Sequence, residues 1–165
     1  MEYLDLYDVN RRSIGKKIIR GKEKPIEETY INIVIVFIEN NDGKFLIQKT
    51  SKEKGSVFAT PGGLVSSGYT PDDTIIKELK EELGIDVKID ELILFYTVKR
   101  KQAFQDAYYL KKDIDINKLT LQEYEVEYVK WFNTNEINKL IENNKFREGN
   151  IKSFNKLLEV KNENK

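Results

Sequence analysis

Residues 61–85 read PGGLVSSGYTPDDTIIKELKEELGI, and no other stretch of the chain specifies its local structure so completely. Thr70 is a favoured N-cap residue, and Pro71 has the backbone angle that the first helical position requires. Gly84 suits the left-handed conformation that ends many helices. Between these signals, apolar residues recur at helical spacing, namely Ile75, Ile76, Leu79 and Leu83. The sequence therefore predicts an amphipathic helix that follows a Gly-Gly pair and ends at Gly84.

Three glutamates of this helix, Glu78, Glu81 and Glu82, share one sector of its surface. At roughly 100° per residue they fall within about 100° of one another, and Glu78 and Glu82 lie at the margin of the apolar stripe. Like charges four residues apart repel by about 0.2 to 0.5 kcal/mol even on an exposed helix, and a divalent cation would remove that conflict. The other interpretation is a solvated face in which Lys77 pairs with Glu81. A loop that curls back from the glycine pair would add backbone carbonyl ligands, which favours the cation site.

Apolar runs on both sides of the helix predict strands. Residues 30–38 form an almost continuous run rich in Ile and Val, which is typical of a central strand covered on both faces. The turn residues 40–43 (Asn-Asn-Asp-Gly) separate this run from residues 44–49, so we expect an antiparallel hairpin. Further strands are expected at residues 92–98, 103–110 and 126–132, and an amphipathic segment at residues 151–158.

The order of these elements predicts a single α/β domain over residues 1–165, with a mixed β-sheet between helical layers. Residues 1–29 are expected to form a lead-in hairpin, residues 30–145 the core, and residues 146–165 a C-terminal helix and tail. A further helix is expected to start at Thr134, with the Thr134 hydroxyl as its cap.

The composition narrows the chemistry that the chain can perform. Its 165 residues include 28 Lys and Arg, 28 Asp and Glu, and neither Cys nor His. This excludes a disulfide, a Cys/His zinc site, a cysteine nucleophile and a histidine-dependent serine hydrolase site. Oxygen ligands suit hard cations such as Mg2+ and Mn2+. Zero formal charge gives no signal for nucleic acid, and no apolar run is long enough to span a bilayer. We therefore expect a cytoplasmic protein without nucleic-acid or membrane partners.

The motif around the glutamates resembles the signature of the Nudix hydrolase family, which is Gly, five residues, Glu, seven residues, then Arg-Glu-apolar-x-Glu-Glu-x-Gly-apolar. Gly63 takes the first place, and residues 78–85 (ELKEELGI) match the final part. Two positions depart, because Tyr69 stands where the family has Glu and Lys77 where it has Arg. The resemblance implies that, in family members, the Glu and Arg at these two positions form an ion pair that braces the loop against the helix. The Tyr69 hydroxyl could accept from Lys77, although a single contact braces less well than a guanidinium fork.

The resemblance implies a Nudix-like α/β/α sandwich that hydrolyses a small-molecule diphosphate, such as a nucleoside diphosphate linked to another moiety, with Mg2+ or Mn2+ as cofactor. It implies that Glu78, Glu81 and Glu82 bind the metal, with the Gly63 carbonyl as a further ligand. Activation of the attacking water would fall to Glu81 or to a glutamate on a later segment. Glu125 is the first candidate there, and Glu123 the second. Family members often pair as homodimers, but no surface in this sequence marks such an interface.

Two sets of side chains are candidates for substrate binding. Basic residues that could reach phosphates are Lys49, Lys54 and Arg100, with Lys99 and Lys101 beside them, although such charges usually lie on a solvated surface. Aromatic residues that could stack on a base are Tyr96, Phe104, Tyr108 and Tyr109, although aromatic residues in strands more often pack in the core.

Two other functions stay open at this point. The departures at Tyr69 and Lys77 are compatible with a ligand-binding or interaction module that turns over weakly or not at all. The lead-in segment resembles that of Nudix members related to isopentenyl diphosphate isomerase. That isomerase chemistry uses a Cys and metal-binding His residues, and this chain contains neither.

Overall fold

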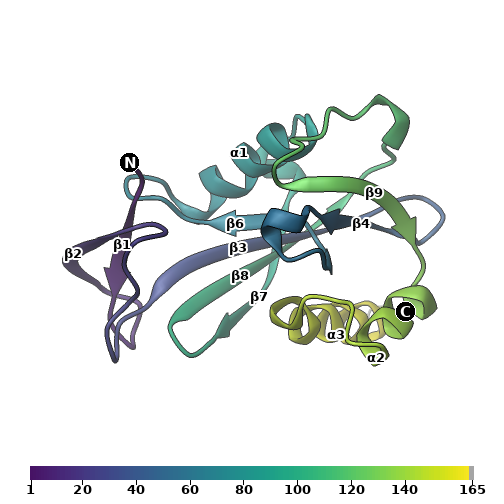
Figure 1. Cartoon of the computed structure of the whole chain (residues 1–165). Coiled ribbons are helices and arrows are strands. Elements are labelled where there is room, and N and C mark those ends of the chain that lie inside the picture. The colour runs from purple at the N-terminus through teal and green to yellow at the C-terminus, as the bar shows by residue number, and fades with distance from the viewer. Residues whose placement is uncertain (164–165) are drawn as a thin grey trace.

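The structure is a computed structural model that describes residues 1–163 (Figure 1). The strands are β1 (Tyr3–Tyr7), β2 (Ser13–Ile19), β3 (Ile31–Glu39), β4 (Phe45–Thr50), β5 (Phe58–Ala59), β6 (Gly62–Leu64), β7 (Ile93–Lys99), β8 (Ala103–Lys111) and β9 (Val126–Phe132). The helices are α1 (Pro71–Leu83), α2 (Thr134–Glu142) and α3 (Glu148–Glu163). Short 3-10 turns follow β4, α1 and β8, namely η1 (Lys52–Lys54), η2 (Ile89–Glu91) and η3 (Ile116–Lys118).

Most of the strands form one mixed sheet. Its order is β5-β4-β3-β8-β7, with β6 also paired to β3 and β9 to β4. Strands β3 and β8 run parallel from the pair Ile31–Ala103 to the pair Glu39–Lys111, and the other pairings are antiparallel. The predicted hairpin between β3 and β4 is confirmed, because the Asn40 N–H donates to the Lys44 carbonyl across the turn.

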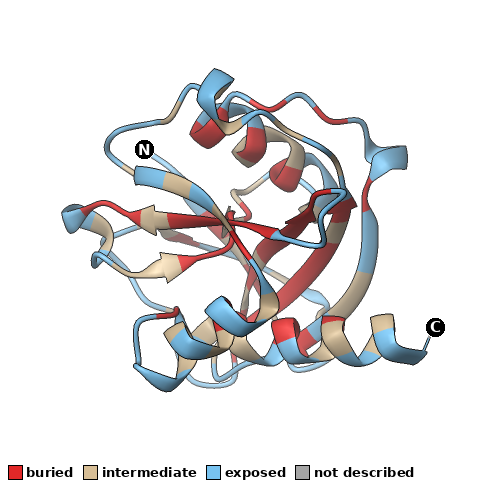
Figure 2. Ribbon diagram, turned by 90° about the vertical axis from the view of Figure 1, so that its right-hand side faces the viewer, coloured by how far each residue is buried: buried red, intermediate tan, exposed pale blue. Residues whose placement is uncertain are grey.

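Strand β3 separates two hydrophobic cores. Its residues Val34 and Val36 pack with apolar residues of α1, whereas Ile35 and Phe37 pack on the other face with residues of α3 such as Phe154. Helix α1 therefore covers one face of the sheet, and α2 and α3 cover the other (Figure 1). Buried residues are concentrated in the sheet and on the helix sides that face it (Figure 2). The predicted α/β class, with a mixed sheet between helical layers, is confirmed.

The predicted ends of α1 are confirmed. The Thr70 hydroxyl accepts from the Asp73 N–H at 3.0 Å, Pro71 occupies the first turn, and Gly84 has a positive φ of 72°. Helix α2 starts at Thr134 as expected, but its cap is a different residue. The side chain of Asn133 accepts from the Glu136 N–H at 2.8 Å, so the expected Thr134 cap was wrong by one position. Asn and Thr are both good caps, and sequence alone does not separate neighbouring candidates.

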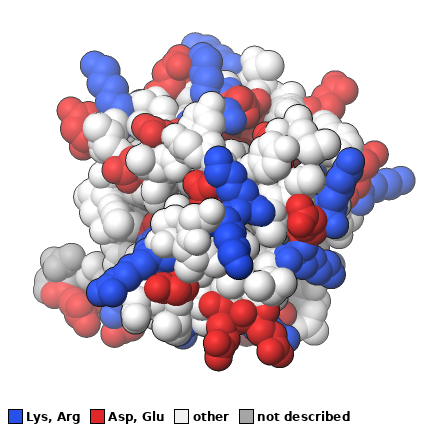
Figure 3. Space-filling model, turned by 90° about the vertical axis from the view of Figure 1, so that its left-hand side faces the viewer, with Lys and Arg blue, Asp and Glu red and all other residues white. Residues whose placement is uncertain are grey.

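The N-terminal segment forms the expected hairpin, β1–β2, and this hairpin packs against the domain. Leu4 and Leu6 are each 3% exposed and lie near Leu64 of β6. Arg11 in the hairpin turn donates to both carboxylate oxygens of Asp106 on β8, at 3.0 and 2.6 Å. On the side of the molecule where the hairpin lies, basic and acidic side chains are interspersed (Figure 3). Among residues 1–163, every helix is too short or too polar to cross a bilayer.

Candidate active site

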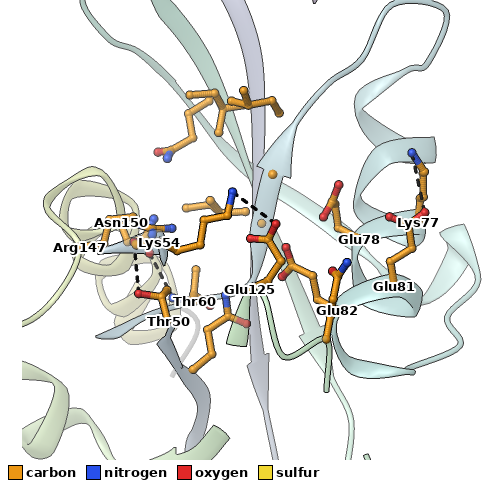
Figure 4. Close-up of a pocket in the computed structure, with 18 of the residues that line it drawn as sticks. Thr50, Lys54, Thr60, Lys77, Glu78, Glu81, Glu82, Glu125, Arg147 and Asn150 are labelled. Carbon is orange, nitrogen blue, oxygen red and sulfur yellow. Dashed lines mark hydrogen bonds and ion pairs between the residues drawn. The ribbon is translucent and has the colours of Figure 1, made fainter. Parts of the chain in front are cut away.

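A cavity of about 540 Å³ lies between α1, the sheet and the start of α3. Helix α1 contributes Glu78, Glu81 and Glu82 to one wall. The facing wall includes Lys54, Thr60, Arg147 and Asn150, so the glutamates of α1 lie opposite basic and polar side chains (Figure 4). The predicted residues Gly63, Lys54, Arg100 and Glu125 also line this cavity.

Strand β6 and helix α1 together position Glu78. A β-carbon added to Gly63 would lie 2.7 Å from Cδ of Glu78 and 2.9 Å from its Oε1. Any larger residue would therefore displace this carboxyl group. The requirement for glycine arises from space, since no left-handed backbone angle is found at Gly63. The glycine pair thus allows the β6 backbone and the Glu78 carboxylate to share the same corner of the cavity.

Glu82 lies deeper in the cavity wall than Glu78. It is 6% exposed, and its Oε2 has no hydrogen-bond partner among the described residues. Burial, and then the charge of neighbouring Glu78, raise the pKa of Glu82 to about 9. Burial also raises the pKa of Glu78. Two carboxyl groups that resist ionisation in this way form a site for positive charge.

Glu81 has a different environment from the other two glutamates of α1. Its side chain is 51% exposed, and Oε1 lies 3.9 Å from Nζ of Lys77, as the alternative interpretation of the helix expected (Figure 4). Lys77 Nζ lies 4.8 Å from the centre of the Tyr69 ring. The suggested contact with the Tyr69 hydroxyl is therefore replaced by a contact with the ring face. This cation–π contact joins the loop to α1 in place of the family's Glu–Arg pair.

Glu125 reaches the cavity from the loop before β9. The Gln122 N–H donates to the Glu82 carbonyl at 2.9 Å, and the Ser51 N–H donates to the Glu125 carbonyl at 3.1 Å. These bonds fix the loop between α1 and β4. Oε1 of Glu125 lies 3.4 Å from Nζ of Lys54, and the charge of Glu125 contributes to the raised pKa of Glu82. Glu123, the second candidate, is exposed and does not line the cavity.

Several other candidate residues lie elsewhere. Lys49 is not a cavity residue, and its Nζ lies 4.8 Å from the centre of the Phe58 ring. Tyr108 and Tyr109 donate hydrogen bonds to Asp72 and Glu39, both at 2.6 Å, outside the cavity lining. The remaining candidates that do not line the cavity are Tyr96, Phe104, Lys99 and Lys101.

Sequence reasoning missed three cavity residues that bear on its chemistry. Gln48 interrupts the apolar run of β4, and a polar residue at a buried strand position was the available signal. Arg147 precedes α3, and Arg20 lies at the end of the N-terminal hairpin. No local pattern marks these arginines, because only the folded chain brings them to the glutamates.

The donor set suits a hard divalent cation. Glu78 and Glu82 offer carboxylate oxygens, and Oε2 of Glu82 is buried without a partner. Carboxylate and carbonyl oxygens are the ligands that Mg2+ and Mn2+ prefer. Within residues 1–163, no three Asp or Glu side chains converge closely enough to hold a metal, because Glu81 turns toward Lys77. The assignment of all three glutamates as ligands therefore stays a prediction.

Comparison with known proteins gives consistent results. A profile of the NUDIX domain family matches residues 29–154. A Listeria monocytogenes protein described as an uncharacterized Nudix hydrolase is 30% identical over 150 residues, which cover 88% of each chain. An ADP-ribose pyrophosphatase of Methanocaldococcus jannaschii is 29% identical over 86 residues, which cover 50% of this chain and 51% of its own length. The structure of DR0079 from Deinococcus radiodurans has a TM-score of 0.78 at 21% identity, and the match covers 93% of this chain and 96% of that one.

Proposed function

Because the chain belongs to the NUDIX domain family and is a pyrophosphohydrolase, we propose that it cleaves the diphosphate linkage of a nucleoside diphosphate joined to another moiety, with Mg2+ or Mn2+ as cofactor. The observation that carries this proposal is the pair formed by half-buried Glu78 and buried Glu82. Both carboxyl groups face a cavity, both have raised pKa values, and Oε2 of Glu82 has no partner. The pyrophosphatase activity named for the Methanocaldococcus jannaschii relative supports a substrate of this class.

Glu78, Glu82, Glu81 and the Gly63 carbonyl would hold the cation. Glu81 would join the site by leaving Lys77, and an exposed ion pair of this kind contributes only about 0 to 1 kcal/mol. When bound, a divalent cation supplies positive charge that neutralises phosphate oxygens and holds the diphosphate in place.

Glu125 is the proposed proton acceptor. In the reaction, a water oxygen bonds to one phosphorus while the bond from that phosphorus to the bridging oxygen breaks, and the water proton passes to the Glu125 carboxylate. Lys54 pairs with Glu125 and orients it. Because proton transfer of this kind contributes about 10²- to 10⁴-fold, Glu125→Gln should lower kcat by about 100-fold or more. If instead Glu81 accepts the proton, Glu81→Gln will show this loss and Glu125→Gln will not.

A binding module without turnover is the second function that the sequence left open. Its motivation was poor bracing at the two departures from the signature. The contact of Lys77 with the Tyr69 ring provides a brace, which supports an ordered site and therefore turnover.

The test is release of phosphate or nucleotide from nucleotide sugars, dinucleotides, nucleoside triphosphates and isoprenoid diphosphates, with Mg2+ or with a chelator. The wild-type chain should turn over at least one of these compounds only with the metal, and Glu82→Gln should not. Glu127→Gln is the matched control, because Glu127 is exposed on β9 and does not line the cavity. If the wild type and Glu82→Gln are equally inert on every compound, hydrolysis by this site is refuted. Activity on isoprenoid diphosphates alone would favour a function like that of the members related to isopentenyl diphosphate isomerase.

A further inference from the structure

Two arginines face the glutamates from different parts of the chain. Arg100 follows β7, and Arg147 immediately precedes α3. Both line the cavity, yet neither forms an ion pair with any carboxylate in residues 1–163. The three other Lys and Arg residues that line the cavity, Arg20, Lys54 and Lys77, are each paired with a carboxylate. The cavity therefore holds two guanidinium groups whose hydrogen-bond donors are available to a ligand.

The surrounding backbone holds the two arginines beside each other. A β-carbon on Gly149, in the first turn of α3, would lie 2.7 Å from Nη1 of Arg100. Arg100 thus contacts the helix start two residues beyond Arg147. The Arg147 N–H donates to the Phe58 carbonyl at 2.8 Å, and the Arg100 N–H donates to the Ala103 carbonyl at 2.7 Å. Each side chain therefore extends from a fixed backbone segment.

The charges at this position are unbalanced. Burial lowers the pKa of Arg147, and the charge of Arg100 lowers it further, while Glu82 and Glu125 oppose the change. Two like charges in contact with the same helix start repel each other, and the partial positive charge of the helix N-terminus adds to the repulsion. A bound anion would remove this conflict. Phosphate matches the guanidinium group well, because its oxygens accept two parallel hydrogen bonds.

We propose that Arg100 and Arg147 form an anion subsite for a second phosphoryl group of the substrate, separate from the diphosphate linkage at the glutamates. The proposal rests on the proposed function and names its substrate class more closely. The substrate would be a nucleoside triphosphate, or a diphosphate whose second moiety ends in a phosphate monoester. A cavity of about 540 Å³ is within the usual range for sites that hold a small ligand.

The first experiment measures binding of inorganic phosphate to the full chain by calorimetry, in the presence of a chelator. Because the metal is absent, this result does not depend on turnover. Arg147→Gln and Arg100→Gln should each weaken binding about 10- to 100-fold, the effect of losing charged hydrogen bonds. Arg12→Gln is the control, since Arg12 lies in the exposed hairpin turn outside the cavity lining. Equal binding by all four proteins, or no binding by the wild type, would overturn the subsite.

A second variant tests the position of the Arg100 guanidinium without changing its charge. Gly149→Ala keeps both arginines but places a methyl group where the Arg100 guanidinium lies, and the end of that flexible side chain can move. Phosphate binding should weaken while the thermal unfolding midpoint changes little. Unchanged phosphate binding in this variant would show that the observed position of Arg100 is not the binding position, and would count against the subsite.

The kinetic experiment compares a nucleoside triphosphate with a nucleoside diphosphate sugar of the same base, with Mg2+. Arg147→Gln should raise KM for the triphosphate about 10-fold or more and leave KM for the sugar derivative within about 3-fold. Equal losses on both substrates would mean that the arginines serve the scissile diphosphate, and the proposed subsite would be wrong. If the wild type turns over neither compound nor any other diphosphate, the proposed function fails, while the phosphate measurement still decides the subsite.

Discussion

Replacing Glu82 by Gln should stabilise the metal-free protein while abolishing its activity. The carboxyl group is buried beside Glu78, and burial and this neighbour raise its pKa from 4.5 to about 9. A carboxyl group with a higher pKa in the folded chain than in the unfolded chain binds more protons when folded. Its stabilising contribution is therefore fully present below pH 4.5 and is lost progressively as the pH rises toward about 9.

The size of the effect follows from the same values. At pH 7.5 the solution is about three pH units above the unfolded pKa, and each unit is worth about 1.4 kcal/mol. At this pH, the raised pKa of Glu82 therefore lowers the free energy of unfolding of the wild type by about 4 kcal/mol relative to acidic solution. Gln has a similar shape and carries no charge. We expect Glu82→Gln to be more stable by about 2 to 4 kcal/mol, which raises the unfolding midpoint by about 5 to 15 °C.

The assay is thermal or urea unfolding with a chelator present, from pH 4.5 to pH 9. The wild type should lose stability across this range, and Glu82→Gln should lose much less. Glu81→Gln is the control, because Glu81 is 51% exposed and should change stability by less than about 0.5 kcal/mol. The free energies of unfolding of the wild type and Glu82→Gln should converge near pH 4.5. If Glu82→Gln is not more stable at pH 7.5, or if the wild type is equally stable from pH 5 to pH 9, the reasoning about buried charge is wrong.

Three further substitutions test other parts of the site and fold. Gly63→Ala should place its methyl group 2.7 Å from Cδ of Glu78 and lower kcat by about 10-fold or more, measured on any accepted substrate; unchanged kcat would show that the carboxylate position is unimportant. Tyr69→Ala should remove the ring contact with Lys77 and cost about 0.5 to 1 kcal/mol in urea unfolding, whereas Tyr69→Phe should be neutral; a loss in Tyr69→Phe would assign the contact to the hydroxyl. Asp106→Asn should weaken the bidentate pair with Arg11 of the hairpin and cost about 3 kcal/mol in the same assay. A loss below about 0.5 kcal/mol would mean that the other contacts of the hairpin hold it without this ion pair.

Local signals in the sequence predict much of this fold. The caps and periodicity of α1 and the turn between β3 and β4 act over a few residues, and the structure confirms both. The partial shielding of Glu82 also follows from its angle on the helix, because it lies at the edge of the apolar stripe.

The parts that sequence did not predict depend on contacts between distant residues. The parallel pairing of β3 with β8 and the arrival of Arg147 opposite α1 need the whole fold. The orientation of Glu81 depends on whether its partner is Lys77 or a bound cation, and the helix pattern allowed both. A charge run also does not distinguish Lys54, which lines the cavity, from Lys49, which covers an aromatic ring.

The position of β3 between the two cores restricts how this chain can change in length. Neighbouring residues of β3 point to opposite sides, so deletion of a single residue within the strand would exchange the α1-facing and α3-facing side chains beyond that point. Such a deletion would break both cores together. The turn at residues 40–44 begins after Glu39, the last residue of β3, so a change in its length does not shift the side chains of β3. Length variation compatible with folding should therefore be found in the turn, while the strand itself keeps a fixed number of residues.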